Sequence, residues 1–280
     1  MRAVRSWAGV VSLGGMVSGA CQKPVGAVPE TRRATSALEG VGATQALREF
    51  EFQALPEAAG LLQRVVRESG DIDARQELAD VYRRAGYGSL AEFFAATVAV
   101  LRGEPVPHWE MPADVQWLCP DTDEQLPHRS PASKAAAERS AVGEFREAAQ
   151  GLRRTIEQDG FSCFLAVQWS EAALYDAVPL ADDVDWLDLE LALRVFLTGF
   201  EEVHTGPAGN AGSAAGFETL SGVFLGMGDH VSCYTAAMIA PDRLASEEVL
   251  PEWAQEAMIE EFQELAQLCK PRVGGREPQT

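Results

Sequence analysis

The fold of this chain is decided by residues 58–101, which read AAGLLQRVVRESGDIDARQELADVYRRAGYGSLAEFFAATVAVL. Apolar side chains recur here at every third or fourth position, which is the period of an amphipathic helix. The period breaks at Gly70 and Asp71 and again over residues 85–88, so the stretch predicts three helices joined by very short turns. Helices connected in this way pack as antiparallel neighbours, and we therefore expect helical hairpins.

The helical period continues into the second half of the chain. Residues 133–159 predict one long amphipathic helix that begins at Ser133 and ends at Asp159. Residues 161–178 are apolar with little periodicity, and their low content of β-branched residues favours a helix over a strand. This part of the sequence adds helices and no clear strand.

Residues 185–201 are apolar on nearly every face, which predicts a central helix capped at its N-terminus by Asp185. One or two helices should follow over residues 217–240, and a last helix should begin at Ser246. The predicted fold class is all-α, with helical hairpins over residues 45–102 and a compact helical second half over residues 134–269.

The first hairpin resembles a tetratricopeptide repeat. Leu78, Ala79 and Tyr82 stand at the spacing of the first-helix signature, Gly86 fits the inter-helix turn, and Ala91 fits the small residue of the second helix. The likeness covers residues 58–103, at most two units, whereas a free-standing array needs about three. An unrelated helical hairpin with alanine at a close crossing would give the same pattern.

The repeat-like spacing also implies a binding surface. We expect a groove between Tyr82, Phe93 and Phe94 to contact a protein partner.

The first twenty-one residues have the pattern of an export signal. Arg2 and Arg5 precede an uncharged run over residues 7–17, and small residues 18–20 precede Cys21. The apolar run is too short to cross a bilayer, which takes roughly 20 residues. The pattern resembles the signal of bacterial lipoproteins.

That resemblance implies cleavage after Ala20 and a lipid on Cys21, which would attach the protein to a membrane of the cell envelope. Ser18 stands where the family usually has an aliphatic residue. Gln22, in place of aspartate, favours sorting to the outer membrane. The alternative is an ordinary secreted protein in which Cys21 is a disulfide partner.

The remaining composition is that of a folded, acidic protein. The hydrophobic and charged fractions, 46% and 23%, are typical of a globular chain. The net charge of -19 disfavours binding to nucleic acid. Residues 21–44 predict a flexible tether, residues 103–133 a proline-rich connector, and residues 270–280 a disordered tail.

Four cysteines remain after Cys21 and are candidates for two disulfides. Three pairings are open for Cys119, Cys163, Cys233 and Cys269, and the sequence does not choose among them. Their wide spacing disfavours a zinc site. Some of them could instead be buried free thiols.

The densest acidic cluster, over residues 182–188, lacks the spacing of a calcium loop, and helix capping explains it; we expect no metal and no cofactor. The glycine-rich segment 204–216 predicts a loop between helices. An enzyme built on it would use His204, Ser213 or His230.

The sequence favours a lipid-anchored envelope protein that binds an unidentified envelope protein as an adaptor or scaffold, without catalytic activity. Two alternatives remain. One is an envelope hydrolase that uses the 204–216 loop, and the other is a purely structural lipoprotein.

Overall fold

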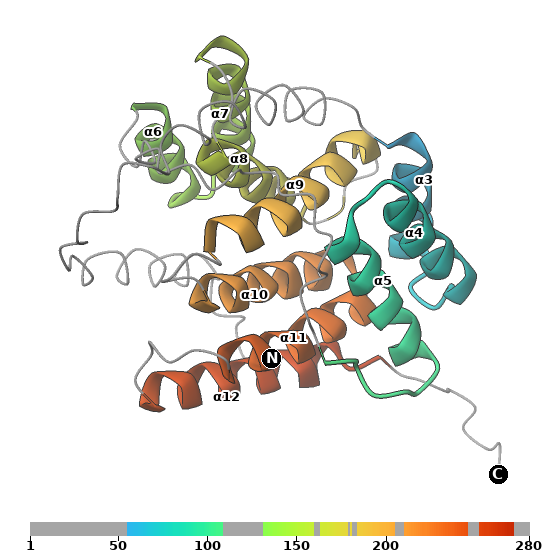
Figure 1. Ribbon diagram of the computed structural model, residues 1–280. Helices are drawn as coiled ribbons and strands as arrows, with labels where there is room; N and C mark the ends of the chain where they lie inside the picture. The colour runs from blue at the N-terminus through green and yellow to red at the C-terminus, as the bar shows by residue number, and fades with distance from the viewer. Residues whose placement is uncertain are drawn as a thin grey trace, which may run out of the picture.

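The computed structural model describes residues 55–108, 131–159, 163–178, 180, 184–204, 210–245 and 252–271 (Figure 1). All regular structure in these residues is α-helical, which confirms the predicted fold class. The helices are α3 (Pro56–Arg67), α4 (Ile72–Arg84), α5 (Gly88–Leu101), α6 (Pro131–Ser140), α7 (Phe145–Asp159), α8 (Cys163–Asp176), α9 (Trp186–His204), α10 (Asn210–Met227), α11 (His230–Ala245) and α12 (Glu252–Cys269). None of these helices is both long enough and apolar enough to cross a bilayer.

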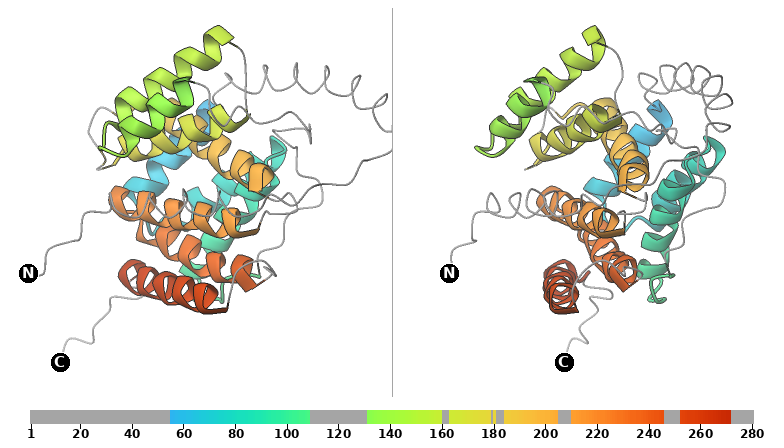
Figure 2. Two further views of the ribbon diagram at one scale, coloured as in Figure 1. Left: turned by 90° about the vertical axis from the view of Figure 1, so that its left-hand side faces the viewer. Right: turned by 60° about the vertical axis from the view of Figure 1, so that its left-hand side comes forward.

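Helix α9 lies in the middle of the molecule, as the apolar residues on most of its faces predict. It packs against α3, α5, α8 and α10. Three groups of helices surround it, namely α3–α5, α6–α8 and α10–α12, and within each group the helices that follow one another along the chain pack together (Figures 1 and 2). The helix α12 lies at the outer edge, where it packs mainly on α11.

The two breaks between the first three helices fall where the sequence predicts. Asp71 caps α4 by accepting a hydrogen bond of 2.9 Å from the backbone N–H of Ala74. Gly86, with φ of 86°, makes the turn between α4 and α5, a conformation that costs glycine little. The α4–α5 hairpin is thus present, while its likeness to a tetratricopeptide repeat stays a prediction.

The single helix predicted over residues 133–159 is wrong, because the structure has two. Helix α6 ends at Ser140 and α7 starts at Phe145. Gly143 lies between them with φ of 81°, which is outside the helical region. The neighbouring Val142 is 71% exposed, so no packing holds this segment in a helix.

The loop predicted over residues 204–216 is also largely helical where it is described. Helix α9 extends to His204, and α10 already begins at Asn210. The structure buries Ala214 and Gly216, so packing of small residues against neighbours outweighs the low helix propensity of glycine. For the last helix, the predicted start at Ser246 lies outside the described residues.

The predicted cap of α9 is confirmed. Asp185 Oδ1 accepts hydrogen bonds from the backbone N–H groups of Leu187 and Asp188, at 3.0 and 3.3 Å. Asp188 in turn pairs with Arg153 of α7 at 3.1 Å. These two members of the acidic cluster have structural roles, and Asp182 and Asp183 lie outside the described residues.

An aromatic cluster joins the first hairpin to α10. The Phe93 ring stacks on Phe224 with centroids 5.8 Å apart and on Phe217 at 6.5 Å. Tyr82 stacks on Phe94 at 5.8 Å. All five side chains are almost completely buried, so the core is continuous between the two halves of the chain.

A buried ion pair joins α4 to the start of α11. Arg75 Nη2 lies 2.5 Å from Asp229 Oδ1, and both side chains are completely buried. Arg75 also donates to the Ser69 carbonyl and to the Ser232 hydroxyl, at 2.9 Å each. Asp229 caps α11 by accepting from the backbone N–H of Ser232. Most donors and acceptors of the pair are therefore satisfied, as burial of charge requires.

A second buried ion pair joins α9 to the first hairpin. Arg194 Nε donates to Glu190 Oε1 at 2.8 Å, and its Nη1 donates to the Tyr87 hydroxyl at 3.0 Å. Glu190 Oε2 accepts from the backbone N–H of Leu55, just before α3. One charged pair thus fixes α9 against both α3 and the α4–α5 turn.

Candidate functional site

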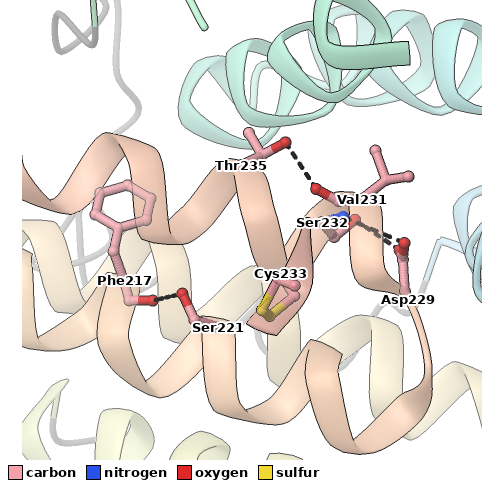
Figure 3. The surroundings of a disulfide bond; sticks show 8 residues. Phe217, Ser221, Asp229, Val231, Ser232, Cys233 and Thr235 are labelled. Carbon is pink, nitrogen blue, oxygen red and sulfur yellow. Dashed lines mark hydrogen bonds between the residues drawn. A yellow bond between two sulfur atoms is a disulfide. The ribbon is translucent and has the colours of Figure 1, made fainter. Parts of the chain in front are cut away.

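The C-terminal helix α12 is fixed to α11 by a disulfide between Cys233 and Cys269. Both cysteines are completely buried, and their Cα atoms are 5.6 Å apart. Figure 3 shows the bond with the hydrogen bonds of nearby residues, including that of Ser232 to Asp229. Of the other candidates, Cys163 is the first residue of α8, and Cys119 and Cys21 lie outside the described residues.

The buried side of α12 continues from this disulfide along the helix. Phe262, Leu265 and Ala266 are almost completely buried, and Met258 and Ile259 are partly buried against the same core. These residues recur at spacings of three and four, so they form one face of α12. This face packs against the core, as the sequence predicts.

The opposite side of α12 is exposed and carries large apolar side chains at its two ends. Trp253 is 74% exposed and Leu268 is 63% exposed. Between them, exposed glutamates occupy positions 256, 260 and 264. We call these five residues, Trp253, Glu256, Glu260, Glu264 and Leu268, the outer face of α12.

The outer face carries a row of negative charges. Helix α12 contains five glutamates and no lysine or arginine. Among the described residues, no ion pair involves Glu256, Glu260 or Glu264. Like charges four residues apart on a helix destabilise it by about 0.2–0.5 kcal/mol per pair. Helix stability therefore does not account for this row of acids.

Two other glutamates, Glu171 on α8 and Glu218 on α10, are partly buried and have raised pKa values. Burial raises the pKa of Glu171 to about 7. Burial, together with the charge of Glu261 on α12, raises the pKa of Glu218 to about 7. Burial and the charges of Glu171 and Glu218 raise the pKa of Tyr175 to about 12, although Thr219 hydrogen-bonds its hydroxyl.

Carboxyl groups that titrate near neutral pH occur at catalytic sites but also wherever a carboxyl is simply buried. Sequence reasoning did not single out Glu171 or Glu218. The sequence feature that could have identified them is a single acid in the middle of an apolar helical stretch. Glu171 has this position within residues 163–176, and Glu218 has it within residues 214–225. With pKa values of about 7, the carboxyl groups of Glu171 and Glu218 gain or lose a proton near neutral pH.

Helix α10 separates two residues of the alternative enzyme site, Ser213 and His230. Ser213 lies in the first turn of α10 and His230 begins α11, directly after the end of α10. The helix rises about 1.5 Å per residue, so roughly 21 Å of α10 separates Ser213 from Met227. The backbone positions of Ser213 and His230 therefore lie near opposite ends of α10, and His204 is the last residue of α9.

The predicted groove between Tyr82, Phe93 and Phe94 is wrong. All three side chains are completely buried. Their apolar faces pack against one another and against the helices of the second half, including α10. The sequence pattern identified an apolar face but could not show that the same chain covers it.

The described residues contain no group of three or more histidines, cysteines or acids arranged to hold a metal ion. The chain matches no protein-family model, and neither curated proteins nor solved structures show significant similarity to it.

Proposed function

We propose that this chain is a lipid-anchored protein of the bacterial cell envelope whose folded part binds a protein partner. The observation that carries the proposal is the order of residues 1–21, with two arginines, an apolar run too short to span a bilayer, and small residues before Cys21. These residues lie outside the described part of the structure.

The disulfide between Cys233 and Cys269 supports export. Disulfides persist in oxidising compartments such as the bacterial periplasm and are rare in the cytosol. Both cysteines are buried, and they belong to α11 and α12. In a reducing compartment these two helices would have no covalent bond between them.

The outer face of α12 supports partner binding. Tryptophan is among the residues that contribute most to protein interfaces. Trp253 is largely exposed beside a row of acids that form no ion pair within the described part of the chain. A lipid-anchored protein with such a surface can hold a partner close to the membrane.

The anchor is tested by mass spectrometry of the full chain expressed with its leader in a bacterium. We expect the N-terminal peptide to begin at Cys21 and to carry diacylglycerol, and the protein to sediment with membranes. Cys21→Ala should lose the lipid and the membrane association, whereas Cys119→Ala should keep both. An intact Met1 terminus, or Cys21 paired with another cysteine, would contradict the proposal.

A further inference from the structure

The outer face of α12 belongs to a helix that packs on the core of the molecule. Its helix is held from behind by Phe262 and Leu265 and at its C-terminal end by the buried disulfide. A surface that is already ordered loses little conformational entropy on binding. Trp253 and Leu268 are separated by fifteen residues, or roughly 22 Å along the helix.

The charges of the outer face indicate which kind of partner can bind it. The three glutamates stand four residues apart, so they form one row between the two apolar ends. Because no cation among the described residues pairs with this row, a partner that supplies cations at the same spacing gains ion pairs and relieves the mutual repulsion of the acids.

Other occupants fit less well. A second copy of this chain also carries a net charge of -19, so electrostatic repulsion opposes self-association. Anionic lipid headgroups are repelled for the same reason. The row of acids alone does not make a metal site, and the flanking apolar side chains have no role in one.

We propose that the outer face of α12 docks a cationic amphipathic helix of another protein. Apolar side chains of that helix pack on Trp253 and Leu268, and its lysines or arginines pair with Glu256, Glu260 and Glu264. The inference deepens the proposed partner binding and rests on it, but it does not depend on the lipid anchor.

The test uses the purified full chain and a synthetic fifteen-residue amphipathic helix with lysines four residues apart and leucines at both ends. A second peptide has glutamates in place of the lysines, and a third has the lysine peptide's composition in scrambled order. We expect the first peptide to bind at least tenfold more tightly than the other two, measured by calorimetry.

Variants of the chain separate docking from general charge attraction. Replacing Glu256, Glu260 and Glu264 together by glutamine should weaken binding of the lysine peptide at least tenfold. The matched control replaces the exposed Glu77, Glu104 and Glu144 by glutamine and removes the same charge elsewhere; it should change binding less than twofold. Trp253→Ala should also weaken binding, and thermal unfolding of every variant should match that of the parent chain.

Equal weakening by the two triple variants would overturn the proposal, as would equal binding of the scrambled peptide or no binding at all. Self-association through α12 in sedimentation, or binding to anionic vesicles that Trp253→Ala abolishes, would assign the face to a different occupant and would also overturn it. The calorimetry should also be repeated with the Cys21→Ala variant, which cannot carry the lipid. If that variant binds the lysine peptide as the parent chain does, docking on α12 does not depend on the lipid anchor.

Discussion

At the scale of single residues, Asp229 has two roles in this fold. Its carboxylate neutralises the buried guanidinium of Arg75, and the same carboxylate caps α11 through the backbone N–H of Ser232. Asparagine can keep the cap, because its side-chain oxygen accepts the same hydrogen bond. It cannot supply the negative charge.

We therefore predict that Asp229→Asn lowers the free energy of unfolding by about 3–5 kcal/mol, because it leaves Arg75 charged and buried without a counter-ion. Urea denaturation followed by tryptophan fluorescence measures this. The control is Asp80→Asn, which breaks the exposed pair with Arg83 and should cost about 1 kcal/mol or less. Equal losses for the two variants would show that the Arg75–Asp229 pair contributes no more than a surface pair.

At the scale of elements, a disulfide links the helix α12 to α11. It lies at the edge of the molecule and packs mainly on α11, and the disulfide closes a loop with a sequence separation of 36. The outer face of α12 remains a fixed surface only while this helix stays docked.

We predict that replacing Cys233 and Cys269 together by alanine lowers the free energy of unfolding by about 3–4 kcal/mol, the value expected for a loop of this length. Dithiothreitol should lower the melting temperature of the parent chain by more than that of the double variant. A melting temperature of the parent chain that does not respond to reductant would mean that the bond is not formed or does not stabilise the fold.

At the scale of the whole molecule, stability should depend on pH through Glu171 and Glu218. Their pKa values are raised to about 7 in the folded chain, whereas in the unfolded chain they return to the ordinary value for glutamate, near 4.3. The folded state therefore binds more protons between these two values, and the free energy of unfolding falls as pH rises from about 4.5 to 7. Above pH 7 this contribution stays constant.

We predict that Glu171→Gln and Glu218→Gln each make the protein more stable at pH 8, by on the order of 2 kcal/mol, and leave its stability at pH 4 unchanged. Denaturation curves at pH 4, 6 and 8 measure the difference from the parent chain. The exposed Glu144 provides the control, since Glu144→Gln should have no such pH-dependent effect. A gain that is the same at every pH would show that packing, and not protonation, is the cause.

Local properties of the sequence were sufficient for the fold class and for several helix ends. The caps at Asp71 and Asp185 and the turn at Gly86 depend on residues within a few positions of one another, and the sequence displays such relations directly. The same local reasoning failed at Gly143, where no packing holds the segment in a helix, and at the start of α10, where packing outweighs propensity.

Only the tertiary structure decided which distant residues meet. Arg75 and Asp229 are 154 positions apart, and Cys233 was one of four cysteines with three possible pairings. It also decided that Phe93 is core and that Trp253 is surface, although both lie in helices with an apolar face. Helical periodicity records that a face is apolar, and only the packing of all the helices determines whether that face is covered.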